Sequence, residues 1–248
     1  MLQNYKLRHS IENYNGQSLN PIPSFALAND GETGLYYLLI YNQLKILVYN
    51  EHWEYQRNLT LSENPLYSLY ANNSTYISLS GGVIRKYDKY LNEYIQTNET
   101  GYYRGLYFNA TNGLIYAANS NNQISIFDQN LSFVRSFSIF FSPHIITDYN
   151  RMLVVTDYFS GNISFYQDSV LIQTISTYCQ NRVNSILFDD YNHMMVLCID
   201  PSIIYIYHTN GTYIGIGFQT SDCLPRCMNF DSNDRLIITC TNNIGIYY

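Results

Sequence analysis

Arg104, Asn184 and Arg226 each stand five residues before the polar residue that ends a predicted strand, and His144 stands four before the end of its own strand. Guanidinium groups donate paired N–H bonds to carboxylates and other oxyanions, so these side chains are suited to binding an anion. Tyr102 and Tyr103 precede Arg104 and add the aromatic surface that peptide and sugar ligands contact. We take these six residues as the candidate ligand site. The alternative is that they are solvated residues at the rim of the fold.

The same positions offer little to a metal ion or to catalysis. Only one of the five histidines, His144, falls at a strand position whose side chain is expected to face inward. None of these inward-facing positions holds Asp or Glu. Calcium needs six to eight oxygen ligands and catalytic zinc needs three protein ligands. Asp148, Asp189 and Asp231 end strands and are expected to cap turns. Since phosphate-loop, dinucleotide and Gly-x-Ser-x-Gly motifs are also missing, we expect no metal, no cofactor and no catalytic residue.

All five cysteines lie in the last 70 residues. Cys227 and Cys240 fall on neighbouring predicted strands, which favours a cross-strand bridge. Cys179 and Cys223 fall in successive loops and form a second candidate pair. The alternative is that Cys198, Cys227 and Cys240 are small buried apolar residues.

Asn-x-Ser/Thr sequons occur eight times, an excess of about twofold over what the composition alone would give. The candidate glycosylation sites are Asn58, Asn72, Asn73, Asn98, Asn109, Asn130, Asn162 and Asn210. Together with the cysteines they favour an extracellular domain of a longer precursor; a cytoplasmic protein is the alternative.

The elements that must position these residues follow from an internal repeat. Ile46, Ile84, Ile124, Ile163, Ile204 and Ile244 are each followed three residues later by an aromatic residue, and they are 38, 40, 39, 41 and 40 residues apart. We expect these aromatic residues to pack between repeats, with the tyrosine hydroxyls reaching water. The repeat is therefore about 40 residues long.

Each repeat contains four β-runs separated by polar turns, which predicts a four-stranded antiparallel meander. Six such sheets indicate an all-β fold, a six-bladed β-propeller forming one domain over residues 1–248. The last repeat lacks a fourth strand, and we expect residues 5–11 to supply it and close the ring. The predicted blades cover residues 21–60, 65–97, 102–138, 143–175, 182–218 and 224–248.

The net charge and the hydropathy of the chain exclude two classes of partner, nucleic acids and the membrane interior. A net charge of −6 leaves no basic stripe for DNA or RNA. No apolar run approaches the roughly 20 residues that cross a bilayer, so we expect no membrane span. The N-terminus lacks the apolar run of a secretory signal.

The fourth repeat reads Leu153-Val154-Val155-Thr156-Asp157, then Gly161-Asn162-Ile163-Ser164-Phe165-Tyr166. This pattern resembles the NHL repeat, in which an apolar strand ending in Ala-Asp is followed by Asn, a basic residue and Ile-x-Val-Phe. Pro65, Pro143 and Pro225 resemble the same family's opening proline. WD and kelch signatures fit less well. The resemblance implies a six-bladed propeller; related propellers include lactonases and amidating lyases that hold zinc or calcium in the central channel.

We therefore expect a non-enzymatic recognition or scaffold module, monomeric, which binds a protein, peptide or glycan through the loops of one propeller face. The alternative is a propeller hydrolase or lyase with a metal at the central channel, working around His144 and the two arginines.

Overall fold

The computed structural model describes residues 7–11, 13–14, 17–18, 27–30, 34–219, 224–230, 235–240 and 244–247. The chain forms two compact units. One unit comprises Leu66–Val183, and the other comprises Met1–Pro65 together with Asn184–Tyr248. The organisation of the whole chain as one domain stays a prediction.

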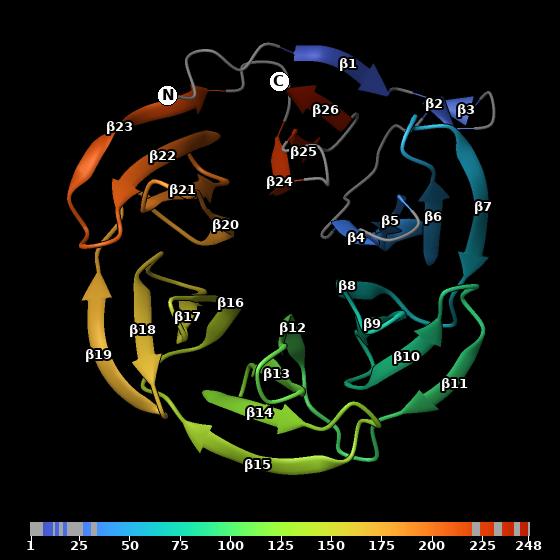
Figure 1. The fold of residues 1–248 in the computed structure, drawn as a ribbon, viewed down its shortest axis with the longest axis horizontal. Helices are drawn as coiled ribbons and strands as arrows, with labels where there is room; N and C mark the ends of the chain where they lie inside the picture. The colour runs from blue at the N-terminus through green and yellow to red at the C-terminus, as the bar shows by residue number, and fades with distance from the viewer. Residues whose placement is uncertain are drawn as a thin grey trace. The chain divides into compact units, whose positions relative to one another are not determined.

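Strands make up nearly all of the secondary structure in these residues. They form six four-stranded antiparallel sheets (Figure 1). In five of them neighbours in sequence are neighbours in the sheet, and in the sixth a strand from near the N-terminus joins three strands from the C-terminal part of the chain. The described ranges contain no α-helix, only a 3-10 turn at Tyr41–Gln43, and no helix in them is long and apolar enough to cross a membrane. The predicted fold class, a six-bladed β-propeller, is confirmed.

The unit of residues 66–183 holds blades 2, 3 and 4. Blade 2 contains β8 (Pro65–Ala71), β9 (Ser74–Leu79), β10 (Ile84–Asp88) and β11 (Glu93–Gln96). Blade 3 contains β12 (Tyr103–Asn109), β13 (Leu114–Asn119), β14 (Gln123–Phe127) and β15 (Phe133–Ser138). Blade 4 contains β16 (Pro143–Tyr149), β17 (Met152–Asp157), β18 (Ile163–Gln167) and β19 (Val170–Ile175).

The other unit holds blades 1, 5 and 6. Blade 1 contains β4 (Leu27–Asp30), β5 (Leu35–Ile40), β6 (Lys45–Tyr49) and β7 (Tyr55–Thr60). Blade 5 contains β20 (Val183–Phe188), β21 (His193–Cys198), β22 (Ile203–His208) and β23 (Tyr213–Gln219). Blade 6 contains β24 (Pro225–Phe230), β25 (Leu236–Cys240), β26 (Ile244–Tyr247) and β1 (Leu7–Ile11), and a short hairpin pairs β2 (Asn13–Tyr14) with β3 (Gln17–Ser18).

Burial falls from the middle strands of a blade to its outer strand. All six residues of β9 are buried, whereas five of the six residues of β15 are exposed. A strand whose two faces are both covered by neighbouring elements reads as a continuous apolar run, and this explains the Val-, Ile- and Leu-rich second strands. Alternating exposure along β7 marks a strand with one covered face.

The aromatic residue of the repeat is buried wherever its side chain is described. Tyr49, Tyr87, Phe127, Tyr166 and Tyr207 are between 0% and 4% exposed, as expected for residues that pack between sheets. The hydroxyls of Tyr49 and Tyr166 are themselves buried, so the expectation that these hydroxyls reach water is wrong. The Ile-plus-aromatic strand is thus part of the apolar core.

One predicted ligand residue belongs to this core. Tyr103 is 1% exposed, packs in a cluster with Tyr76 and Leu106, and meets Phe127 edge-to-face at 5.8 Å between ring centroids. Burial raises the pKa of its hydroxyl. Its assignment to the ligand site is wrong, because β12 turns the Tyr103 side chain into the sheet packing.

The predicted closing strand is present. β1 pairs antiparallel with β26, with Leu7 opposite Tyr247 and Ile11 opposite Ile244. Blade 6 thereby gains its fourth strand from the other end of the chain, and the edge of β26 is covered.

Deletion of residues 1–12 should therefore uncover the edge of β26 and either lower the melting temperature by about 10 °C or more, or cause aggregation. Differential scanning calorimetry of full-length and truncated chains measures this. Addition of a synthetic peptide of residues 1–12 should restore part of the loss. An unchanged melting temperature in the truncated chain would show that β1 contributes no stability.

The turn between the third and fourth strands repeats one hydrogen-bonding device. In blade 3, Asp128 Oδ1 accepts from the backbone N–H groups of Asn130 at 2.8 Å and Ser132 at 2.9 Å. In blade 2, Asp88 Oδ1 accepts from Tyr90 and Asn92 at 2.8 and 2.9 Å.

The buried leucine in each of these turns takes a left-handed conformation. Leu91 has φ 61° and Leu131 has φ 59°, and both side chains are at most 5% exposed. Burial of the side chain offsets the conformational cost of a left-handed non-glycine residue. The aspartate carboxylate holds the turn that makes this possible.

Asp128→Ala should cost about 1–2 kcal/mol of unfolding free energy, because two backbone donors lose their acceptor. Asp128→Asn keeps the Oδ1 acceptor and should stay within about 0.5 kcal/mol of wild type. Urea unfolding followed by fluorescence compares the three proteins. Equal stability of the alanine and asparagine variants would refute the role of the carboxylate.

The cysteines differ from one sequence-based expectation. Cys227 is a buried reduced thiol whose Sγ lies 3.6 Å from the Met228 carbonyl oxygen, while Cys179, Cys198 and Cys240 are disulfide-bonded. The predicted Cys227–Cys240 bridge is therefore wrong. The strand register gives the reason, because Cys227 lies opposite Thr239 and Cys240 lies opposite Pro225. Cys223 lies outside the described residues, and its pairing with Cys179 stays a prediction.

Candidate binding face on the loops of blades 3 and 4

The connections at one end of blades 3 and 4 bring polar and aromatic residues together. In an antiparallel meander, the start of the first strand and the turn between the second and third strands lie at the same end of the sheet. We call the loops 97–102, 139–142 and 176–182, with the β17–β18 turn 158–162, the loop face. All of it belongs to the unit of residues 66–183.

Tyr158, in the β17–β18 turn, is the centre of this face. The guanidinium carbon of Arg104 lies 3.8 Å from the centroid of the Tyr158 ring, and that of Arg182 lies 5.2 Å from it. Arg182 Nη1 also donates to the Tyr158 hydroxyl at 2.8 Å. Both arginines are therefore held against one aromatic ring.

Ser142 connects this ring to the start of β16. The Tyr158 backbone N–H donates to the Ser142 carbonyl oxygen at 2.8 Å, and Arg104 Nη1 donates to Ser142 Oγ at 3.0 Å. Arg104 also lies over the Tyr102 ring, at 5.5 Å from its centroid. The orientation of Arg104 is thus fixed by a stacking contact and a hydrogen bond.

His144 packs beside Tyr158 as a neutral ring. Its Nδ1 lies 2.8 Å from the Val183 carbonyl oxygen, so Nδ1 carries the proton and donates it to that carbonyl. Its ring meets Tyr158 edge-to-face at 5.1 Å. Burial, reinforced by the charges of Arg182 and Arg104, lowers the pKa of His144 to about 3, although the bond to Val183 acts in the opposite direction.

The two positive charges are not neutralised within the described part of the chain. Neither Arg104 nor Arg182 has a described carboxylate oxygen within 4.0 Å. Asp157, next to Tyr158, uses its carboxylate in the turn, where it accepts from the Phe159 N–H at 3.1 Å and from Ser160 Oγ at 2.6 Å. The two guanidinium groups therefore lie on this face without a described ion-pair partner, although the face also carries the exposed carboxylate of Glu99.

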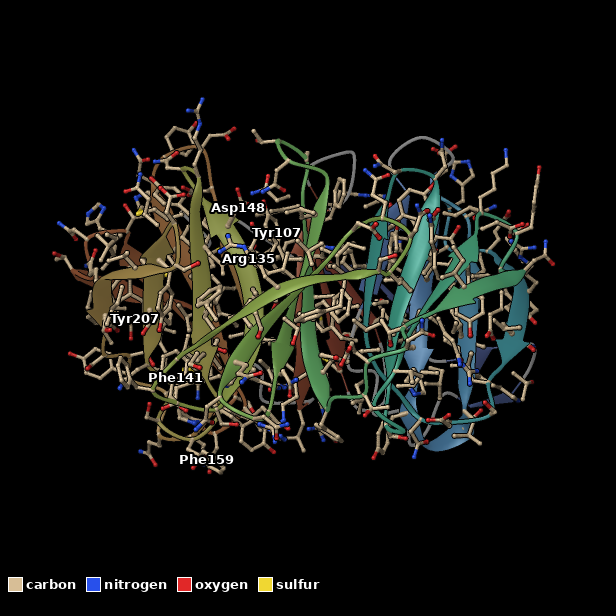
Figure 2. The ribbon with its side chains drawn as sticks, turned by 90° about the horizontal axis from the view of Figure 1, so that it is seen from below. Tyr107, Arg135, Phe141, Asp148, Phe159 and Tyr207 are labelled. Carbon is tan, nitrogen blue, oxygen red and sulfur yellow. The ribbon has the colours of Figure 1, made fainter. Side chains whose placement is uncertain are left out.

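Large apolar side chains are exposed in the same loops. Tyr102, Phe140, Phe159 and Tyr178 are 40%, 96%, 70% and 59% exposed, and all four lie in the loops of this face. Figure 2 shows Phe159 and Phe141 at one end of the blades of this unit, and Tyr107, Arg135 and Asp148 toward the other end. Exposed aromatic residues clustered in this way mark a contact surface.

The other end of blades 3 and 4 carries a polar pocket of about 110 Å³. Its lining includes Tyr107, Arg135, Asp148, Arg151 and Tyr166. Burial raises the pKa of the Tyr107 hydroxyl, and the neighbouring carboxylate of Asp148 raises it further.

The predicted ligand residues are distributed as follows. Arg104 and His144 meet at Tyr158, and Tyr102 lies beside Arg104. Asn184 is buried on β20 and Arg226 is half-buried on β24; both belong to the other unit, and their participation stays a prediction.

Arg182 and Tyr158 complete the site and were missed by the choice of strand positions. Arg182 lies in the loop two residues before Asn184, and Tyr158 follows the strand-ending Asp157. A search of each whole loop, instead of one or two positions per strand, would have included both.

The sequons lie mostly at the surface. Asn58, Asn72, Asn73, Asn98, Asn130 and Asn210 are exposed, and Asn109 and Asn162 are half-buried. Their glycosylation stays a prediction. The described residues contain no group of three or more His, Cys, Asp or Glu side chains placed to hold a metal ion.

Comparisons with known proteins support the fold. No known family's sequence profile matches the chain, and no curated protein matches it in sequence. Among solved structures, the crystal structure of the WD40 β-propeller domain of Doa1 is similar, with a TM-score of 0.71 and 10% sequence identity over 90% of this chain and 78% of that one. At this identity the similarity shows the propeller fold alone.

Replacement of His144 by Asn should flatten the pH dependence of stability below neutrality. The unfolded chain titrates this histidine near 6.5 and the folded chain near 3. Between these values the unfolded state binds more protons, so wild-type stability should fall with decreasing pH by up to about 1.4 kcal/mol per unit from this residue.

Urea unfolding at pH 7, 6, 5 and 4 measures the two slopes, with the exposed His52→Asn variant as a control for the substitution itself. Parallel slopes for wild type and His144→Asn would contradict a neutral His144.

Proposed function

We propose that this protein is a non-enzymatic recognition module, which binds a partner protein or peptide through the loop face of blades 3 and 4. The carrying observation is the exposed aromatic set Tyr102, Phe140, Phe159 and Tyr178 around two arginines that have no described acidic partner. Aromatic and arginine side chains are the residues that contribute most to binding energy at protein interfaces.

The scaffold suits this role. WD40 propellers, to which the fold is similar, typically mediate protein interactions, and a rigid β-framework with variable loops is a common way to build a binding surface. The proposal includes the NHL-like character of the repeat, a monomeric state and a glycan as the alternative ligand.

Affinity capture with the immobilised full-length chain tests the proposal. Proteins retained by wild type should be lost when Phe140 and Phe159 are both replaced by Ser, because the exposed apolar contact area is removed. Tyr90→Ser is the matched control, since Tyr90 is 60% exposed in the β10–β11 turn, outside the loop face.

Retention should be equal for wild type and Tyr90→Ser, and mass spectrometry with isotope labels quantifies the ratio. A set of retained proteins that is unchanged by the double substitution would show that this face does not bind them.

A further inference from the structure

We propose that Arg104 and Arg182 bind the carboxylate of a single aspartate or glutamate in a partner protein, and that an adjacent apolar residue of the same segment packs on the exposed aromatic residues of the loop face. This inference rests on the proposed function and names the chemical group that the site binds.

The geometry leaves the arginine donors available. A guanidinium has five N–H donors, and each arginine uses one of them in the described structure: Arg104 on Ser142 and Arg182 on Tyr158. Because Arg104 is stacked on the Tyr158 ring, its remaining N–H groups lie in the plane of a fixed fork, which is the geometry that matches a carboxylate. Little side-chain entropy is then lost on binding.

The charge balance favours an anion. Two guanidinium groups share one tyrosine ring, and the carboxylate of the neighbouring Asp157 is engaged by the turn. Two guanidinium carbons that lie 3.8 and 5.2 Å from one ring centroid are at most 9.0 Å apart, so the two charges repel each other, and a bound carboxylate offsets this repulsion by attracting both.

His144 acts as a positioning residue. It donates Nδ1–H to Val183, so its remaining ring nitrogen presents a lone pair and not a donor to an anion. Its role is to pack against the edge of Tyr158 and fix the ring on which the arginines lie.

The negative net charge of the protein favours a partner segment that carries a single acidic residue. A chain of net charge −6 repels polyacidic segments and nucleic acids at long range. Phe140 and Phe159 beside the arginines favour an apolar neighbour of the acid, such as Leu or Phe. The inferred ligand is therefore an acidic residue flanked by apolar residues.

The test is a selection of random 12-residue peptides displayed on phage against the immobilised full-length chain, followed by fluorescence polarisation with synthetic copies. Selected peptides should carry Asp or Glu next to an apolar residue. Arg104→Gln and Arg182→Gln should each weaken binding at least tenfold, whereas Arg135→Gln, an exposed arginine on β15, should leave it unchanged.

A substitution in the peptide, combined with the arginine substitutions, completes a double-mutant cycle between peptide and protein. Asp→Asn in the peptide should weaken binding to wild type tenfold and leave no further effect of Arg104→Gln, because the same contact is then already lost. The loss caused by the peptide substitution is measured on the wild-type protein alone, so this part of the test stays decisive if an arginine variant fails to fold.

The outcomes separate the two proposals. Peptides whose affinity falls with the Phe140/Phe159 double variant but not with either arginine variant would overturn the carboxylate inference and leave the recognition function standing. Absence of any selected peptide that depends on Arg104, Arg182, Phe140 or Phe159 would overturn both.

Discussion

The middle strands of each blade are buried on both faces, and this constraint decides where the protein can carry a binding site. Every residue of β9 is buried, and most polar residues buried on the middle strands carry small hydroxyls, such as Thr75, Thr156 and Thr239. Lys86 on β10 is an exception, and its Nζ donates to the Gln129 carbonyl oxygen at 2.9 Å. A charged side chain there loses its hydration and needs buried partners to compensate, as Lys86 has in the Gln129 carbonyl and the Tyr76 ring. Chemistry is therefore confined to strand ends and loops, where a side chain can be held by the framework and still reach a ligand.

On the loop face, this framework holds two arginine side chains against one tyrosine ring. Tyr158 accepts a hydrogen bond from one arginine and offers its ring to both. His144 stays neutral because burial outweighs the hydrogen bond to Val183. The result is a pair of guanidinium groups on one tyrosine ring, in loops that also carry exposed aromatic residues, on a chain that is acidic as a whole.

The sequence predicted the parts of the fold that follow from periodicity. Ile124 and Phe127, spaced as in the other repeats, fall on β14 and are fully buried. The last repeat was one strand short in the sequence, and β1 supplies that fourth strand to blade 6. Tyr102 and Tyr103 show the limit of this reasoning. Adjacent residues at a strand start point to opposite sides, so one is exposed and the other buried, and no repeat pattern indicated which.

The remaining differences come from register and from loops. The β24–β25 register places Cys227 opposite Thr239, one residue away from the Cys227–Cys240 pairing that was expected, and a register difference of one residue has no clear signal in this turn's sequence. Arg182 lies in a loop whose conformation depends on contacts with Tyr158, a residue 24 positions away. Its contribution to the site could only be found once the strands had placed both residues.

Hydrogen–deuterium exchange of the full-length chain, measured with and without a partner obtained by affinity capture, tests most directly whether the loop face is the binding surface. If the loop face binds the partner, protection is expected in residues 97–102, 139–142, 158–162 and 176–182, with little change in the β10–β11 and β14–β15 turns. Protection confined to those turns or to the outer strands, with the loop face unchanged, would contradict it.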